Sequence, residues 1–103
     1  MIDRHRITGF DRDGRNARKN EKHGVSQADA EQVFFNEPLV VLADIGHSSH
    51  EPRFHALGAT DEGRLLHTTF TLRSDNTRLR VISARDMHRK ERAVYEKVSK
   101  ENP

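Results

Sequence analysis

Residues 64–72, Arg-Leu-Leu-His-Thr-Thr-Phe-Thr-Leu, form the stretch that decides the fold we expect. Its threonines and its phenylalanine belong to the residue types that favour a pleated strand. The turn-forming residues 61–63 (Asp-Glu-Gly) come just before it, and residues 74–76 (Ser-Asp-Asn) come just after it. A strand placed between two tight turns predicts an antiparallel neighbour on each side.

Three further strands are predicted over residues 39–43, 53–58 and 79–84. The first is an apolar, partly β-branched run of strand length. Alternation divides residues 53–58 between two faces, with Phe54 and Ala56 on one and Arg53, His55 and Leu57 on the other. Along residues 79–84 it places Leu79, Val81 and Ser83 on one face and Arg80, Ile82 and Ala84 on the other.

Helices are expected before and after these strands. Residues 12–22 are polar and rich in helix formers, so a first helix there depends on docking against the rest of the chain. Ser26 can cap a second helix that ends near Phe35, and Asp29 can complete a capping box with it. A third helix is predicted over residues 86–100.

The length of 103 residues suits one domain, which we expect to span residues 1–103. The order of elements predicts an α+β fold with two N-terminal helices, a four-stranded antiparallel sheet and a C-terminal helix. We expect the helices to pack on one face of the sheet.

Charge is segregated along the chain, although 18 lysines and arginines nearly balance 16 aspartates and glutamates. Residues 12–22 and 73–92 are basic, whereas residues 29–62 are acidic, a distribution that predicts one basic face. The absence of cysteine excludes disulfides and thiolate metal sites. No run is apolar enough to span a membrane or to serve as a signal peptide, so we expect a cytoplasmic protein without membrane partners.

Three blocks of sequence occur in an order that resembles a known family. They are residues 22–26 (Lys-His-Gly-Val-Ser), 53–58 (Arg-Phe-His-Ala-Leu-Gly) and 82–85 (Ile-Ser-Ala-Arg), followed by Glu91-Arg92 and Tyr95. The series resembles the BrnT toxins of type II toxin-antitoxin systems, from about Phe10 to Tyr95. The first and last blocks are specific in combination, whereas either alone is a weak signal.

This resemblance implies a RelE-like fold and endoribonuclease activity that inhibits growth, with no cofactor. It also implies a BrnA-like antitoxin with a ribbon-helix-helix part, which neutralises the toxin in a two-plus-two complex. Promoter DNA would be contacted only through that antitoxin. One departure lies at residues 10–14, where Phe-Asp-Arg-Asp-Gly replaces the family's Phe-x-Trp-Asp-Pro pattern. Arg12 thus replaces an aromatic anchor, which questions how the N-terminal segment docks.

RNA cleavage without a metal needs a base for the 2′-hydroxyl, cations for the phosphate and an acid for the leaving oxygen. Arg85 is the first candidate for the phosphate, because it closes a strand and a guanidinium matches phosphate oxygens. The alternative is a structural ion pair with Glu91 or Asp86. Arg53 and Arg80 are further candidates on strands, unless they are ordinary solvated surface.

His55 and His67 are the candidate acid and base, since imidazole titrates near neutral pH. The alternative is that one packs beside the core and the other is exposed. Further candidate RNA-binding residues are the hydroxyl groups of Thr69 and Ser83, the ring of Tyr95, and the basic groups of Arg89, Lys90 and Arg92. Packing explains the hydroxyl groups and Tyr95 as well or better, and a solvated helix surface explains the basic groups almost as well.

Two competing functions remain open at this point. Residues 44–50, with Glu51 and His55 nearby, hold histidines and carboxylates that suit zinc or nickel, but their spacing matches no standard finger and we expect no metal site. The other possibility is a non-catalytic binding module that docks the antitoxin and acts only as its co-repressor. A neighbouring reading frame for a basic strand-helix-helix protein would support the toxin.

Overall fold

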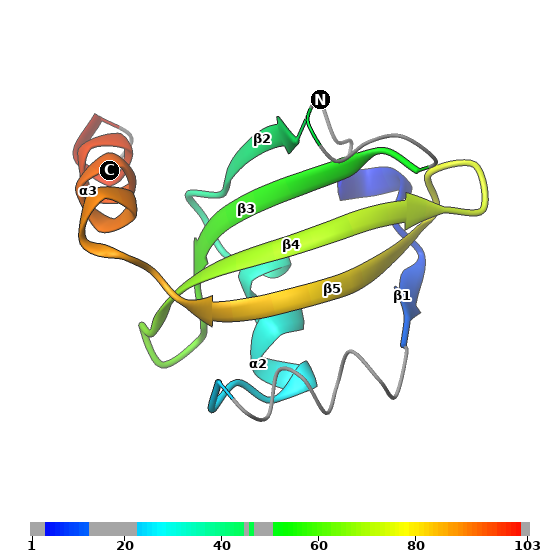
Figure 1. The fold of residues 1–103 in the computed structure, drawn as a ribbon, viewed down its shortest axis with the longest axis horizontal. Helices are drawn as coiled ribbons and strands as arrows, with labels where there is room; N and C mark the ends of the chain where they lie inside the picture. Colours follow the sequence, from blue (N-terminus) through cyan, green and yellow to red (C-terminus); the bar gives the residue numbers. More distant parts are fainter. Residues whose placement is uncertain (1–3, 13–22, 45, 47–50, 102–103) are drawn as a thin grey trace.

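A five-stranded sheet in the order β1-β5-β4-β3-β2 forms the centre of the computed structural model, which describes residues 4–12, 23–44, 46 and 51–101 (Figure 1). The strands are β1 (Gly9–Asp11), β2 (Val40–Asp44), β3 (Arg53–Ala59), β4 (Leu65–Arg73) and β5 (Arg78–Asp86). Strands β2 to β5 form the antiparallel meander that the sequence predicts. Strand β1 was not predicted, and it pairs in parallel with β5. The sheet is therefore mixed.

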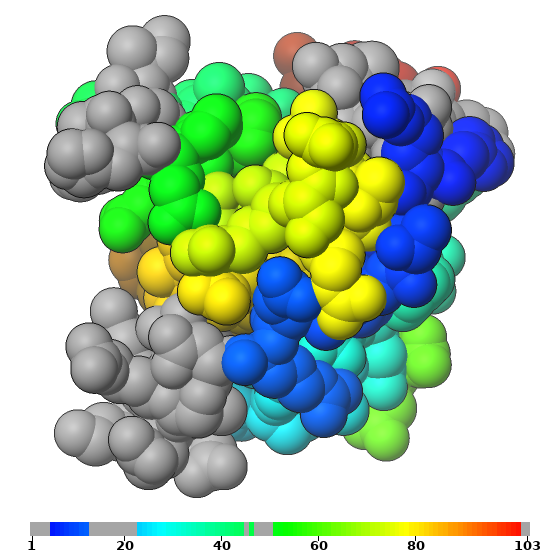
Figure 2. Space-filling view, turned by 90° about the vertical axis from the view of Figure 1, so that its right-hand side faces the viewer, coloured from blue at the N-terminus to red at the C-terminus, as the bar shows by residue number. Residues whose placement is uncertain are grey.

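Strand β1 is held in place by contacts with β5, which lies far from it in the sequence. The guanidinium of Arg78 in β5 donates to the Asp11 carboxylate and, at 2.8 Å, to the Phe10 carbonyl. Figure 2 shows this end of the molecule, where the turn between β4 and β5 (yellow) lies between the start of β3 (green) and the N-terminal segment (blue). A strand of three residues is too short to be predicted from the alternation of apolar and polar residues.

Arg12, which stands where an aromatic anchor was expected, docks the N-terminal segment by charge. Its Nε and Nη2 donate to the two carboxylate oxygens of Glu31 at 3.1 and 2.8 Å. Glu31 is buried and also accepts from the Gln27 amide at 2.9 Å. A bidentate ion pair therefore fixes this segment where packing of an apolar ring was expected.

One face of the sheet carries the main core and is covered by α2 (Gln27–Gln32), which continues into the 3-10 helix η2 (Val33–Phe35). Ser26 caps α2, since its Oγ accepts from the Asp29 N–H at 3.0 Å. This element confirms the predicted second helix. Of the predicted first helix, residues 13–22 lie outside the described residues. A further 3-10 helix, η1 (Arg4–Arg6), precedes β1.

Helix α3 (Arg89–Glu101) lies beyond one end of the sheet, whereas α2 lies behind the strands (Figure 1). Its Tyr95, together with Met87 just before the helix, packs against Leu57, a residue on the opposite face from the main core. The prediction that all helices share one face is therefore wrong. The reason is a second, small apolar patch around Leu57 at the end of β5. Among the described residues, no helix is long and apolar enough to cross a membrane.

A β-bulge interrupts the pairing of β4 with β5. Thr69 pairs with Ser83 whereas the next residue, Phe70, pairs with Val81, so Ile82 is an extra residue in β5. After the bulge Ala84 is buried in the main core, and Ser83 stands opposite Thr69 on the other face. The predicted alternation over residues 79–84 is thus wrong beyond Ile82, because a bulge reverses the faces of the residues that follow it.

The approach of η2 to the sheet depends on a residue without a side chain. A Cβ built on Gly58 of β3 would lie 2.9 Å from Val33 Cβ and 3.2 Å from Leu39 Cδ1. Both neighbours belong to, or pack against, the main core. Gly58 therefore allows η2 to lie close to β3.

We predict that Gly58→Ala lowers the free energy of unfolding by about 1–3 kcal/mol, because an added methyl group overpacks the core. Urea denaturation followed by circular dichroism measures this loss. Gly46→Ala is the matched control, since among the described residues its Cβ would meet Asp44 Oδ1 alone, at 3.8 Å. Equal stability of the two variants would show that η2 can move away without cost.

Candidate active site

The face of the sheet opposite α2, called here the open face, gathers most of the side chains that the sequence singled out. The register of β3, β4 and β5 arranges them in three rows across the sheet. The rows are Leu57–His67–Arg85, His55–Thr69–Ser83 and Arg53–Thr71–Arg80. The five candidate catalytic residues and two candidate RNA-binding residues therefore share one surface.

His55 is held from two sides. Its Nε2 lies 2.9 Å from Asp44 Oδ2, and its Nδ1 lies 2.9 Å from Thr69 Oγ1. Because the carboxylate of Asp44 can only accept, Nε2 carries a hydrogen, and in the neutral ring Nδ1 accepts from the Thr69 hydroxyl. These two contacts fix the ring plane and occupy both nitrogens of His55.

His67 lies beside His55, with ring centroids 4.9 Å apart. Burial lowers the pKa of His67 below its ordinary value, and the positive charge of Arg85 lowers it further. Glu91 acts in the opposite direction, with its Oε2 3.8 Å from His67 Nε2. The balance favours a neutral imidazole at neutral pH, which is the state that can accept a proton.

Arg85 forms a bidentate ion pair with Glu91. Its Nη1 and Nη2 donate to the two carboxylate oxygens at 2.8 and 3.0 Å. Hydrogen bonding from Arg85 lowers the pKa of Glu91 to about 2, helped by the His88 backbone N–H at 2.7 Å. The structural ion pair considered as the alternative role of Arg85 is therefore present, although a third of the guanidinium side chain is exposed, at 32%.

The candidates on α3 differ in their surroundings. Arg89, Lys90 and Arg92 are exposed, so they are available to a ligand. Tyr95 is only 5% exposed, and its hydroxyl donates to the Pro38 carbonyl at 3.0 Å. Burial raises its pKa. The expectation that Tyr95 binds RNA is not supported by this position, because the ring packs in the small cluster under α3.

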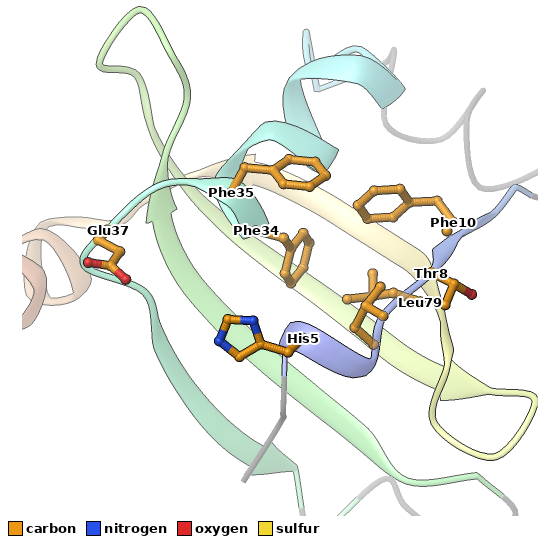
Figure 3. Close-up of a pocket in the computed structure, with 9 residues that line it drawn as sticks. His5, Thr8, Phe10, Phe34, Phe35, Glu37 and Leu79 are labelled. Atoms are coloured by element: carbon orange, nitrogen blue, oxygen red, sulfur yellow. The ribbon is translucent and has the colours of Figure 1, made fainter.

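A hollow of about 530 Å³ lies on the face of the sheet that carries the main core, between η1, β1 and η2. Figure 3 shows the rings of Phe10, Phe34 and Phe35 along it, with His5 and Glu37 also in its lining. Among the described residues, its lining contains no arginine or lysine. This apolar hollow does not suit a phosphate, so we place the candidate active site on the open face.

The sequence suggested residues 44–50, Glu51 and His55 as possible metal ligands. Of these, residues 45 and 47–50 lie outside the described residues. Asp44 and His55, which were part of that group, bond directly to each other. Within the described part of the chain, no group of three or more histidine, aspartate or glutamate side chains could hold a metal ion.

Three residues of the open face were not assigned to the active site from the sequence. Asp44 supports His55, Glu91 binds Arg85, and Arg73 follows Thr71 along β4. The alternation of side chains along β4 could have identified Arg73, because it lies an even number of positions from His67 and therefore on the same face. The role of Asp44 depends on the register between β2 and β3, which leaves no trace in the local sequence.

Comparison with protein families finds a model that matches residues 10–91, described as "Ribonuclease toxin, BrnT, of type II toxin-antitoxin system". The chain belongs to the BrnT toxin family. The matched residues run from β1 to the first turn of α3 and include every residue of the three rows. The predicted resemblance is thus confirmed.

A solved BrnT structure has a similar fold. It is the crystal structure of the Brucella abortus ribonuclease toxin BrnT, which aligns with a TM-score of 0.59 at 21% sequence identity. The alignment covers 79% of this chain and 97% of that chain. Comparison with curated protein sequences finds no match.

We predict that two substitutions shift the pKa of His67 in opposite directions. Arg85→Gln removes a positive charge and raises it, whereas Glu91→Gln removes the carboxylate and lowers it further. Titration of the imidazole signals by NMR measures both shifts. Arg89→Gln, on the same helix as Glu91, is the control and is expected to leave the pKa in place. Shifts of the same sign in the first two variants would contradict this electrostatic account.

Glu91 also makes stability depend on acid. Its pKa in the folded chain is about 2, below the ordinary 4.5, so its contribution is complete above pH 4.5 and is lost as pH falls towards 2. We expect a loss of about 1–2 kcal/mol, since solvent screening reduces the full value of about 1.4 kcal/mol per pKa unit. Urea titrations from pH 6 to pH 2 test this. Glu91→Gln should lack this part of the decline, and an unchanged decline would assign it to other carboxylates.

Proposed function

We propose that this BrnT family member is an endoribonuclease that cleaves RNA without a metal ion or cofactor, at the open face around His67 and Arg85. The observation that supports this most is the position of His67, a histidine with a lowered pKa, directly beside Arg85 on a face of the sheet that also carries Arg53 and Arg80. A base that is unprotonated at neutral pH and cations beside it are the two requirements of such cleavage.

In the proposed reaction His67 accepts the proton of the 2′-hydroxyl as its oxygen attacks the neighbouring phosphorus. The bond from phosphorus to the 5′-oxygen breaks, and that oxygen receives a proton from an imidazolium. The products are a 2′,3′-cyclic phosphate and a 5′-hydroxyl. The proposed donor of that proton is His55, whose ring lies beside that of His67. The leaving oxygen would take the place of Thr69 Oγ1 at Nδ1, while Asp44 stays at Nε2.

Arg85 is the proposed ligand of the phosphate that is cut. The phosphate would replace the carboxylate of Glu91, which now occupies both Nη atoms of the guanidinium. A phosphate oxygen pair presents the same bidentate geometry as a carboxylate. Arg53 and Arg80 extend the positive surface two rows away, and Ser83 adds a hydroxyl in the row between them and Arg85. Arg89 and Arg92 on α3 would contact the RNA backbone without reading its sequence.

The partner proposed for this toxin is a BrnA-like antitoxin with a ribbon-helix-helix part. Membership of a family of type II toxin-antitoxin systems supports a protein antitoxin. In this proposal two toxins and two antitoxins assemble, and promoter DNA is contacted only by the antitoxin. The complex acts in the cytoplasm, where both RNA and the antitoxin are made.

A second candidate function is a non-catalytic co-repressor. The observation that favours it is the Arg85–Glu91 ion pair, which ties up the leading phosphate ligand. In that case the open face would serve only to bind the antitoxin. The two functions differ in whether the isolated chain changes RNA.

The decisive experiment incubates the purified chain with total RNA in EDTA, with and without ribosomes, and maps the ends of the fragments. We predict fragments with 5′-hydroxyl ends from the wild type. His67→Gln should lower the rate by about 10²- to 10⁴-fold, the usual loss for a general base. Arg85→Ala should abolish cleavage and growth arrest while circular dichroism stays unchanged.

His5→Gln is the matched control, because His5 is an exposed histidine in the lining of the apolar hollow, away from the open face. Retained cleavage in His67→Gln would remove that residue as the base. Absence of cleavage by the wild type under all conditions, together with tight binding of the antitoxin, would favour the co-repressor.

A further inference from the structure

A second hollow lies on the open face, beyond the two histidines. Its volume is about 200 Å³, and its lining consists of Glu51, Arg53, Thr71, Arg73, Arg80 and Ile82. The described lining thus contains three arginines and one carboxylate, that of Glu51. We refer to this site as the arginine hollow.

The register of the sheet brings the three arginines together. Arg53 and Arg80 stand on either side of Thr71 in one row, and Arg73 follows two residues later along β4. Thr71 is buried and its hydroxyl donates to the Pro52 carbonyl at 2.7 Å, so the floor of the hollow is fixed. The convergence is therefore built into the strands and does not depend on a loop.

Of the described residues that line the arginine hollow, Arg73 and Arg80 alone outnumber the one carboxylate, that of Glu51. Glu51 accepts from Arg73 Nη2 at 3.1 Å, and this ion pair is half exposed. The Nε atoms of Arg73 and Arg80 are buried and have no hydrogen-bond partner among the described residues. Buried donors and an excess of positive charge favour the entry of an anion that offers several acceptor oxygens.

The place of the arginine hollow suggests which anion enters. Its row, Arg53–Thr71–Arg80, is next to the row of His55, and the row of His67 and Arg85 follows. At about 3.4 Å per residue along β4, Thr71 lies about 14 Å from His67. One RNA strand can span this distance and place a second phosphate in the hollow.

We propose that the arginine hollow is a phosphate subsite that binds an RNA backbone phosphate away from the bond that is cut. This inference rests on the proposed ribonuclease function. It assigns to Arg73 a role in substrate binding and to Glu51 the role of a competitor that occupies the site when RNA is absent. Substrate length therefore matters, because an RNA too short to reach the hollow loses one phosphate contact.

Binding of RNA that cannot be cleaved tests the subsite separately from the reaction. A fluorescent single-stranded RNA with 2′-O-methyl groups is titrated with the full chain in EDTA, at several salt concentrations. Arg73→Gln should weaken binding about 5- to 10-fold and reduce the salt slope by about 0.7, the value for one phosphate contact on a single strand. Arg6→Gln, an exposed arginine in η1, makes the same charge change elsewhere and should stay within about twofold.

Glu51→Gln separates a phosphate subsite from a structural ion pair. If Glu51 and Arg73 only stabilise each other, both substitutions weaken binding; if Glu51 competes with phosphate, Glu51→Gln tightens it, by about two- to fivefold. Glu62→Gln, in the exposed turn before β4, is the control for the change in charge. Looser or unchanged binding by Glu51→Gln, or no measurable binding by the wild type, would overturn the proposal.

Cleavage assays keep this test distinct from that of the proposed function. With a long RNA, Arg73→Gln should raise KM and leave kcat unchanged, and with a dinucleotide it should change neither. Binding that follows the expected pattern without any cleavage would retain the subsite and reject the ribonuclease. Charge variants that alter affinity for the antitoxin and not for RNA would assign the hollow to the protein partner instead.

Discussion

The bulge at Ile82 is the constraint on which the site depends. Arg80 and Arg85 are five positions apart in the sequence. Because this spacing is odd, an unbroken strand would place them on opposite faces. The extra residue restores both to the open face, where the rows of His55 and His67 lie. The same bulge turns Ala84 into the core. One inserted residue thus serves the packing of one face and the chemistry of the other.

Glu91 joins the last helix to that surface. Its carboxylate accepts from the His88 backbone N–H at the start of α3, from Arg85 in β5, and lies near His67. The docking of α3 is otherwise supported by a small cluster around Tyr95. Any ligand that takes Arg85 from Glu91 therefore also releases a contact that orients α3. The proposed binding of a phosphate by Arg85 would therefore be linked to the position of this helix.

The strands of the meander could be predicted from sequence, because β3 and β4 alternate between apolar and polar residues and are bounded by turns. The faces of His55 and His67 followed from the same parity. Strand β1 could not be predicted, since a three-residue strand depends on Arg78, which is 67 residues away from Asp11. The side on which α3 packs could not be predicted either, because Leu57 and Tyr95 come together only in the folded chain.

The candidate site, like the fold, could be predicted from the sequence only in part. Residue type and parity were enough to place the two histidines, Arg53 and Arg80, whereas Arg85 reaches the same face only through the bulge. The states of these side chains depend on partners that the register supplies. Asp44 occupies one nitrogen of His55 and Thr69 the other, which leaves His67 as the histidine without a close carboxylate bond. Its burial beside Arg85 then keeps it neutral. Two histidines of equal standing in the sequence therefore become unequal in the fold, because one is oriented by a carboxylate and the other has a lowered pKa.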